Sequence, residues 1–404
     1  MTLEHMCEQI RENVLQKMDF SKEVNEETLR EIIAHEIPKY DGAQGLTIAQ
    51  RIAVEQRIFN SLRKLDVLQE LLEDEEVSEI LVNGPNHIFY EKKGELKEYK
   101  YSFSSEEKLQ NVIQQIVGKH NRVVNFMSPI VDTRLEDGSR VNVVLYPVSI
   151  DGSAVSIRKF SEQPLSMDVL INQGSITKEA AEFLKLLVQN KYNLFISGGT
   201  SSGKTTFLNA LSAYIPQNER IITIEDSAEL RLQGISNCVR LETRTSNMEG
   251  IKPITARELI HTALRMRPDR IIVGECRGEE TLDMLQAMNT GHDGSLSTGH
   301  ANSTKDMLSR LETMVLMGNE IPLAAVRQQI ASGIDILIHM EKGEGKVRRV
   351  VEITEILGIM DGEIQTQILY QYDKTLKKKG ELFHLSKLNK GDASEKLYEI
   401  SNGR

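Results

Sequence analysis

The sequence contains few cysteines and no long apolar run. Its three cysteines, Cys7, Cys238 and Cys276, are far apart and form no C-x-x-C pair, so we expect neither a disulfide framework nor a zinc knuckle. No window approaches the roughly eighteen uncharged apolar residues that cross a membrane, and the first residues lack the basic and apolar regions of a secretory signal peptide. We therefore expect a cytoplasmic protein without a membrane-spanning segment.

The chain also lacks an excess of positive charge. Its 404 residues carry a formal net charge of −10, which argues against a general affinity for nucleic acid, although an acidic total can contain a local basic channel. Hydrophobic residues make up 40% and charged residues 27% of the chain, as in ordinary soluble globular proteins. The length predicts two or three domains with enough apolar material for a core.

The spacing of hydrophobic residues divides the chain into segments with different predicted secondary structure. Residues 1–62 alternate charged and apolar residues at helical spacing, which predicts an N-terminal helical region. Residues 63–160 contain short strands, two of their turns marked by Asn-Gly and Asp-Gly pairs, and two helical segments at 68–72 and 106–117, which predicts a small α/β domain. Residues 161–175 are typical of a linker. Residues 373–404 form a lysine-containing tail, which we interpret as a solvated charge run rather than a binding arm.

Residues 176–372 form the larger predicted domain. Its expected strands are rich in Ile and Val and lie at residues 194–197, 221–224, 271–274 and 334–338. Near-continuous apolar strands between helices indicate a parallel sheet covered on both faces. The predicted fold class is therefore α/β, with a phosphate-loop NTPase domain after a smaller α/β domain and a helical region.

A phosphate-binding loop is the most specific motif of this larger domain. Residues 198–205 fit the pattern G-x-x-x-x-G-K-[ST] between an apolar run and a helix-like segment, and these flanks argue against a chance glycine loop. A strand, a glycine-rich turn and a helix start point backbone N–H groups and the positive end of a helix dipole at one spot, where phosphate binds. Lys204 would reach the β- and γ-phosphates of ATP, and the Thr205 hydroxyl would coordinate Mg²⁺. The residues expected to bind nucleotide here are Gly198, Gly199, Thr200, Ser201, Ser202, Gly203, Lys204, Thr205 and Thr206.

Carboxylates follow two of the predicted strands. Glu275 ends the segment 270–275, at the edge where open parallel sheets place their ligands, and is our candidate for polarising the attacking water. Because Asp is common at the metal-holding position of phosphate-loop enzymes, we expect Glu275 to contact the metal indirectly. Glu225 and Asp226 follow the strand at 221–224 and would hold Mg²⁺ or orient the nucleophile. A capping cluster for the following turn explains these two residues equally well.

Two histidines lie in one loop rich in Gly, Ser and Thr. Glycine lets the backbone approach a ligand, while His292, His300 and the neighbouring threonines offer hydrogen bonds to phosphate. A γ-phosphate sensor fits this loop better than a zinc site, which would need more ligands nearby. A purely structural loop is the alternative.

Several arginines are candidates for contacting phosphate oxygens through their planar forks. Arg277 lies just after Glu275, and three others lie on predicted strands of the smaller domain: Arg134, Arg140 and Arg158. An arginine supplied from another domain or subunit can make turnover depend on assembly. For any single arginine, a surface ion pair is the alternative.

These motifs occur in an order that resembles the secretion and pilus-assembly ATPases of the type II/type IV superfamily. The chain is most similar to the CpaF-type ATPases of Tad (Flp) pilus systems. The segments that carry this similarity are 83–85, 137–142, 156–160, 267–278, 283–295, 300–303 and 310–312. The resemblance covers roughly residues 65–370, and the lack of a four-cysteine zinc element favours this branch. Cys276 is a departure, because the residue after the Walker glutamate is more often aliphatic.

The resemblance implies a role for each candidate residue. Glu225 and Asp226 would belong to the aspartate box and Glu275 to an atypical second Walker motif. His292 and His300 would belong to the histidine box. The arginines that would reach the nucleotide from the smaller domain are Arg134, Arg140 and Arg158. The resemblance further implies a homohexameric ring in which nucleotide lies between the smaller domain and a RecA-like domain.

We therefore expect a cytoplasmic ATPase motor that associates peripherally with the inner face of the cell membrane. ATP would draw the two domains together, hydrolysis would release them, and the ring would pass this motion to an inner-membrane platform protein. No nucleic acid partner is expected, but a RecA-like nucleic-acid translocase is the main alternative and would need a basic channel. A second alternative is a scaffold that binds ATP and scarcely hydrolyses it, against which the acidic residues at both strand ends argue.

Overall fold

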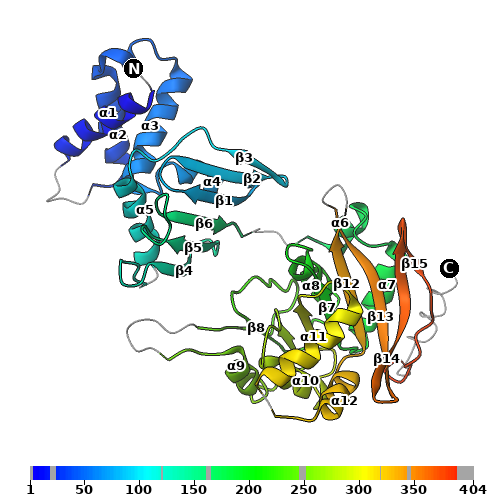
Figure 1. The fold of residues 1–404 in the computed structure, drawn as a ribbon. Coiled ribbons are helices and arrows are strands. Elements are labelled where there is room, and N and C mark those ends of the chain that lie inside the picture. The colour runs from blue at the N-terminus through cyan, green and yellow to red at the C-terminus, as the bar shows by residue number, and fades with distance from the viewer. Residues whose placement is uncertain are drawn as a thin grey trace. The chain divides into compact units, whose positions relative to one another are not determined.

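The computed structural model of the protein divides into two compact units, residues 1–162 and residues 163–404 (Figure 1). The structure describes residues 3–18, 24–119, 122–160, 165–244, 252–318, 320–343 and 347–388. The first residues of the predicted linker, 161–164, and the last of the predicted tail, 389–404, lie outside the described residues.

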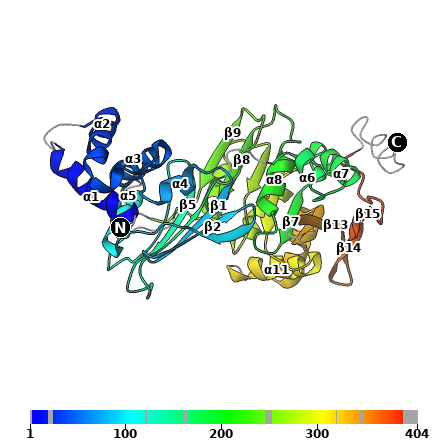
Figure 2. The same cartoon turned by 90° about the horizontal axis from the view of Figure 1, so that it is seen from above.

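Helices form the N-terminal part of the first unit, as the periodicity predicts. They are α1 (Leu3–Lys17), α2 (Glu26–Glu36) and α3 (Ile48–Arg63), with the short 3-10 helices η1 (Ile37–Lys39) and η2 (Asp41–Ala43) between the last two. Their apolar stripes meet in a core around Ile10, Leu29 and Ile58, and Figure 2 shows the three blue helices packed together. Thr47 starts α3 with a capping box, since it exchanges hydrogen bonds with Gln50.

A six-stranded antiparallel sheet forms the rest of the first unit. Its elements are α4 (Leu68–Glu73), β1 (Val77–Asn83), β2 (His87–Lys92), β3 (Glu95–Glu98), α5 (Glu106–Gly118), β4 (Ile130–Arg134), β5 (Arg140–Val144) and β6 (Ala154–Arg158). The strand order is β3-β2-β1-β6-β5-β4. Alternation along the strands buries Val141, Val155 and Ile157 in one cluster with the apolar stripe of α5, and leaves the other face of the sheet polar.

A nine-stranded sheet organises the second unit, in the order β15-β14-β13-β12-β7-β11-β10-β8-β9. The strands are β7 (Leu194–Gly198), β8 (Ile221–Glu225), β9 (Cys238–Glu242), β10 (Arg270–Val273), β11 (Leu296–Gly299), β12 (Ile336–Lys342), β13 (Arg348–Met360), β14 (Glu363–Asp373) and β15 (Thr375–Lys378). From β12 to β9 neighbouring strands are parallel, as expected. The strands β13, β14 and β15, which the sequence analysis did not predict, are antiparallel additions at one edge.

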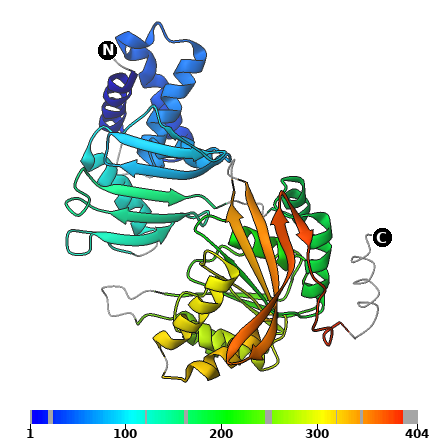
Figure 3. The same cartoon turned by 45° about the vertical axis from the view of Figure 1, so that its right-hand side comes forward.

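Helices cover both faces of this sheet, as the apolar strands predict. The helices are α6 (Met167–Asn172), α7 (Lys178–Gln189), α8 (Lys204–Ser212), α9 (Ala256–Ala263), α10 (Glu280–Asn289), α11 (Thr304–Met317) and α12 (Leu323–Gly333). Successive residues of β7 enter different clusters, since Ile196 packs with α6–α8 and Phe195 packs with α9–α12. Figure 3 shows the green helix α7 and the yellow helix α11 on opposite sides of the strands.

The structure places the edges of the second unit differently from the sequence analysis. Helix α6 lies inside the predicted linker, where Met167 and Leu170 are buried against the core. Strand β15 and the buried Leu382 and Leu388 lie inside the predicted tail. The sequence contains no glycine that would mark the turn before β15, because the residue with positive φ in this turn is Lys374, at 63°.

In the described part of the chain, no helix combines the length and the apolar character needed to cross a membrane.

A buried ion pair joins two strand starts on the side of the sheet away from the phosphate loop. The guanidinium of Arg270 is fully buried, and its Nε lies 2.5 Å from Glu219 Oε2. Arg270 Nη1 donates to the carbonyls of Val188 and Gly294, 2.7 and 3.3 Å away. Because the cation has several partners, Arg270 binds together the starts of β8, β10 and β11.

Replacing the anion of this pair should destabilise the second unit. We expect Glu219→Gln to lower its free energy of unfolding by about 3 kcal/mol, because a buried guanidinium loses its negative partner. Urea unfolding followed by circular dichroism measures this loss. The control is Glu182→Gln, which removes half of a pair whose side chains are 38% and 46% exposed, and should change stability by less than about 0.5 kcal/mol. Equal losses in both variants would contradict the role of Arg270.

Candidate nucleotide-binding site

Two glycines set the shape of the phosphate loop between β7 and α8. The Gly198 backbone packs so closely on β12 that a Cβ atom there would lie 2.4 Å from the Met340 carbonyl oxygen. Gly203 adopts a left-handed conformation, with φ of 93°, at the residue that precedes α8. Glycine is therefore required at Gly198 by close packing and at Gly203 by backbone conformation.

Lys204 is buried inside this loop. Its Nζ donates to the carbonyl oxygens of Gly198 and Gly199, at 3.1 and 3.0 Å, and lies 3.2 Å from His300 Nδ1. Burial lowers the pKa of Lys204. Because a nearby anion favours the charged ammonium, phosphate binding at this loop would offset that shift.

His300 connects Lys204 to Glu275. Its Nδ1 faces the Lys204 ammonium, and its Nε2 lies 2.8 Å from Glu275 Oε1. An ammonium donates, so a neutral imidazole with its proton on Nε2 can accept from Lys204 at Nδ1. The contact with Glu275 is close but is not a hydrogen bond, since Glu275 Oε1 is buried without a hydrogen-bond partner among the described residues. Burial, with a further contribution from the Lys204 charge, lowers the pKa of His300 and favours this neutral form.

Glu275 is held from both sides at the end of β10. Its second oxygen, Oε2, accepts a hydrogen bond from Arg277 Nη2 at 2.8 Å, and Arg277 Nη1 lies 3.6 Å from Asp226 Oδ2. The hydrogen bond to Glu275 raises the pKa of Arg277. Five candidate residues thus form one chain of polar contacts: Lys204, His300, Glu275, Arg277 and Asp226.

The Glu225 side chain is buried against the Gly274 backbone. A Cβ atom added to Gly274 would lie only 2.9 Å from Glu225 Cγ. Glu225 Oε1 accepts hydrogen bonds from the backbone N–H groups of Glu229 and Leu230, at 2.8 and 2.9 Å. Its Oε2 is buried and accepts no hydrogen bond from the described residues. Burial raises the pKa of Glu225. One oxygen therefore organises the turn after β8, as the capping alternative proposed, and the other has no hydrogen-bond partner among the described residues.

The parallel sheet explains why these residues meet. The strands β7, β11, β10 and β8 are consecutive neighbours in the sheet, so their carboxyl ends lie at one edge. The phosphate loop follows β7, His300 follows β11, Glu275 follows β10 and Glu225 ends β8. This is the edge at which open parallel sheets bind their ligands.

The donor set at this edge fits Mg²⁺ held mainly by substrate and water. In the described part of the chain, no group of three or more His, Cys, Asp and Glu side chains is arranged to hold a metal ion. Thr205 begins α8 beside Lys204, and Glu225 Oε2 is a buried oxygen without a hydrogen bond. Mg²⁺ retains several waters and takes few protein oxygens beside phosphate, so these two residues are suitable ligands.

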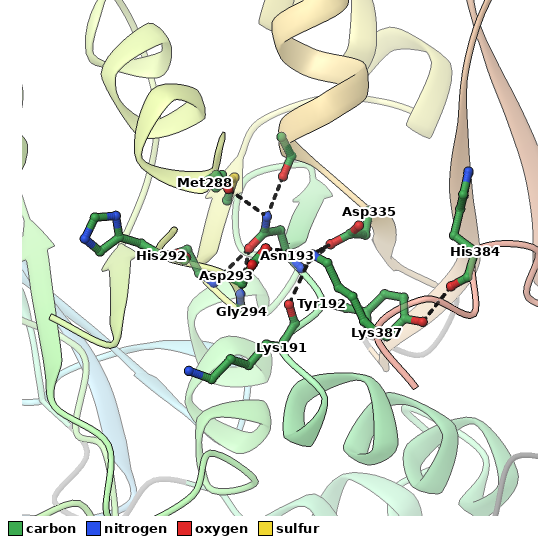
Figure 4. Close-up of polar contacts among 12 residues, drawn as sticks. Lys191, Tyr192, Asn193, Met288, His292, Asp293, Gly294, Asp335, His384 and Lys387 are labelled. Atoms are coloured by element: carbon green, nitrogen blue, oxygen red, sulfur yellow. Dashed lines mark hydrogen bonds and ion pairs between the residues drawn. The ribbon is translucent and has the colours of Figure 1, made fainter. Parts of the chain in front are cut away.

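His292 is not brought to this site within one chain. It lies in the loop before β11, at the opposite edge of the sheet from His300. Asn193 holds this loop, because its Oδ1 accepts from the N–H groups of Gly294 and Ser295 at 2.7 and 3.1 Å. Figure 4 shows the His292 side chain directed away from Asn193. The two histidines were expected together because they share one loop-like sequence, but the four residues of β11 separate them.

The loop of His292 is also tied to the end of the described chain. Lys387 Nζ lies 2.9 Å from Asp293 Oδ1 and 2.7 Å from Asp335 Oδ2 (Figure 4). Burial raises the pKa of Asp335. These contacts explain why part of the predicted tail is ordered against the second unit.

The three arginines of the first unit form a row across its sheet. Arg140 of β5 is the cross-strand partner of both Arg134 in β4 and Arg158 in β6. Direct cross-strand partners project from the same face, which here is the face opposite the apolar core. The structure therefore clusters these three residues, and their contact with nucleotide stays a prediction.

Two residues beside the phosphate loop were not identified from the sequence. His339 of β12 is buried with its Nδ1 2.9 Å from Ser197 Oγ, and Arg348 of β13 donates from Nε to the Ser201 carbonyl at 3.0 Å. Both are more than 100 positions from the loop, at separations of 142 and 147 residues. No local motif marks such residues, since only the pairing of β12 with β7 brings them near.

Comparison with known proteins gives one family. The family model described as "Type II/IV secretion system protein" matches residues 61–342. A putative conjugal transfer protein of Mycobacterium tuberculosis is 32% identical over 314 residues, which are 76% of this chain and 88% of that protein. The type IV secretion system protein PtlH of Bordetella pertussis is 34% identical over 315 residues, which are 72% of this chain and 93% of PtlH.

A solved structure supports the architecture. The crystal structure of the ATPase DotB from Legionella pneumophila matches with a TM-score of 0.54 and 21% identity, over 83% of this chain and 85% of DotB. This likeness confirms the predicted fold class, in which a smaller N-terminal domain precedes a RecA-like domain.

The lowered pKa of His300 predicts a dependence of stability on pH. The unfolded chain binds the proton of this histidine more readily, so the stability due to neutral His300 is complete above about pH 6.5 and is lost as the pH falls through the lowered pKa. Between pH 7 and 5, unfolding free energy should fall more steeply in the wild type than in His300→Gln, by at most about 1.4 kcal/mol per pH unit. Thermal or urea unfolding at several pH values measures these slopes.

The matched control is His87→Gln, which changes an exposed histidine paired with Glu98. This control should keep the wild-type pH dependence. Identical slopes in all three proteins would contradict the assignment of neutral imidazole to His300.

Proposed function

The chain belongs to the type II/IV secretion system ATPase family, and we propose that it hydrolyses ATP to power assembly of a Tad/Flp-type pilus or a related secretion process. The observation that carries the proposal is the continuous contact from Lys204 through His300 to Glu275. These contacts connect the residue that would hold the terminal phosphates to the residue that would act on water.

The residues at the carboxyl edge have distinct parts in the proposed reaction. The backbone N–H groups of the phosphate loop and the start of α8 bind the polyphosphate, and Lys204 places a positive charge beside the γ-phosphate. Glu275 orients the attacking water and accepts its proton, while His300 and Arg277 fix the carboxylate. Asp226 positions Arg277 from the end of β8.

Thr205 and Glu225 would hold Mg²⁺, which would neutralise charge on the phosphate oxygens. Because Glu225 is buried and its Oε1 already serves the turn at Glu229, it would contribute through Oε2. The burial of Lys204 and Glu225 limits solvation of their charges, so phosphate at Lys204 and Mg²⁺ at Glu225 would each stabilise the charged state of its neighbour.

We propose that the motor is a homohexamer in the cytoplasm, where it contacts an inner-membrane platform protein. Its cargo would be a pilin or a secreted protein. The DotB likeness supports the fold of such a motor, and the PtlH relative supports a place in a secretion system. The row formed by Arg134, Arg140 and Arg158 would supply positive charge to nucleotide from the first unit.

Two substitutions separate nucleotide binding from hydrolysis. Lys204→Ala should weaken binding of Mg-ATP at least ~10-fold, because a charged hydrogen-bond donor to phosphate is lost. Glu275→Gln should retain binding and lower kcat by about 10² to 10⁴, because the amide cannot accept a proton. Calorimetry and phosphate release measure the two effects.

The control for these substitutions is Glu279→Gln, which changes an exposed carboxylate on Arg257 close to the site in sequence. Its binding and turnover should equal those of the wild type. Wild-type hydrolysis rates in both Lys204→Ala and Glu275→Gln would contradict the proposed active site.

The arginine row allows a separate test. Arg140→Gln should reduce kcat on the order of 10³-fold if its guanidinium stabilises transferred phosphate charge. Steady-state ATPase assays measure turnover, and sedimentation checks that the variant assembles as the wild type does. Lys97→Gln is the control, because it removes a positive charge from β3 of the same sheet, where Lys97 pairs with Glu95. Unchanged turnover in an assembled Arg140→Gln protein would show that the row does not serve the nucleotide.

A further inference from the structure

Arg348 connects the β12–β13 hairpin to the phosphate loop. It is the first residue of β13, and its Nε donates a hydrogen bond to the Ser201 carbonyl oxygen at 3.0 Å. The side chain also covers Gly203, since its Cδ lies 3.2 Å from the position that a Cβ would take there. Arg348 therefore contacts the loop at two points, although its side chain is exposed and lies on another element.

The hydrogen bond fixes the orientation of a peptide group that faces the proposed phosphate. In a planar trans peptide the carbonyl and the following N–H point in opposite directions. Holding the Ser201 oxygen toward Arg348 consequently aims the Ser202 N–H to the inside of the loop, where it makes a long hydrogen bond of 3.3 Å to the Gly199 oxygen. A phosphate that enters the loop is a better acceptor for this N–H.

The backbone conformation of Ser201 is strained. Its φ is 59°, a left-handed conformation that costs energy for a residue with a Cβ. Because the Ser201 oxygen accepts from Arg348, the hydrogen bond stabilises the loop in this conformation. Among the described residues, Arg348 forms no ion pair with a carboxylate, so its guanidinium is not committed to another partner.

We infer that Arg348 is a positioning residue for the phosphate loop, holding the Ser201–Ser202 peptide in the orientation that binds polyphosphate. This inference rests on the proposed ATP site. It goes further in two ways, because it assigns a role to a residue outside the loop and predicts which part of the nucleotide depends on it. A residue that acts through the loop backbone affects the polyphosphate and not the base or ribose.

The test compares two ligands and four proteins. Calorimetry gives the Kd of Mg-ATP and of Mg-tripolyphosphate for the full-length wild type, Arg348→Gln, Arg348→Lys and the control Lys342→Gln. Lys342 is the cross-strand partner of Arg348 on β12 and is exposed, so the control removes the same charge from the same hairpin. We expect Arg348→Gln to weaken both ligands by the same factor, about fivefold, as for one hydrogen bond.

The other variants should behave differently. Arg348→Lys retains a charged donor and should recover part of the affinity, while Lys342→Gln should stay within twofold of the wild type. At saturating ATP, kcat of Arg348→Gln should also stay within twofold, since Glu275 and His300 are unchanged. A general loss of structure would instead lower the thermal midpoint and kcat together.

Three results would overturn the inference. Equal affinities in Arg348→Gln and Lys342→Gln would show that the contact has no role in binding. A loss confined to Mg-ATP would assign Arg348 to the base or ribose. A wild-type protein that binds neither ligand would contradict the proposed function, and the inference would fail with it.

Discussion

A neutral histidine between an ammonium and a carboxylate is the interaction on which the proposed site depends. His300 Nδ1 lies 3.2 Å from Lys204 Nζ, and its Nε2 lies 2.8 Å from Glu275 Oε1, a close contact without the geometry of a hydrogen bond. The contact with Lys204 needs an imidazole that accepts at Nδ1, and burial favours the neutral form by lowering the pKa of His300.

Buried polar groups lie at both edges of the large sheet. At the amino edge, Asn193 uses both its amide nitrogen and its amide oxygen in hydrogen bonds with the backbone, and Lys387 pairs with two carboxylates. At the carboxyl edge, Ser202 Oγ and Glu225 Oε2 are buried and have no hydrogen-bond partner among the described residues. Unsatisfied buried polar atoms are costly, so these two atoms beside the phosphate loop are suited to contact with a polar ligand.

The sequence predicted those parts that depend on local patterns. The glycine pattern located the phosphate loop, and apolar runs located β7, β8 and β10 with the acidic residues at their ends. Long-range pairing was not predictable in this way. Arg348 reaches Ser201 only because β12 pairs with β7 and β13 pairs with β12, and no residue near either position signals that contact. His292 is close to His300 in sequence, but the strand β11 lies between them, so the structure does not bring the two together within one chain.

Phosphate bound at the loop would replace hydrogen bonds that Lys204 already makes, more than add new ones. Lys204 now donates to its own loop at Gly198 and Gly199, and each of these bonds can be exchanged for a stronger bond to an anion. When Lys204 turns to phosphate, His300 Nδ1 loses its donor while the incoming negative charge raises the pKa of the imidazole. A protonated His300 would donate at both nitrogens, toward phosphate and toward Glu275. The same side chain would then lie between the bound phosphate and Glu275.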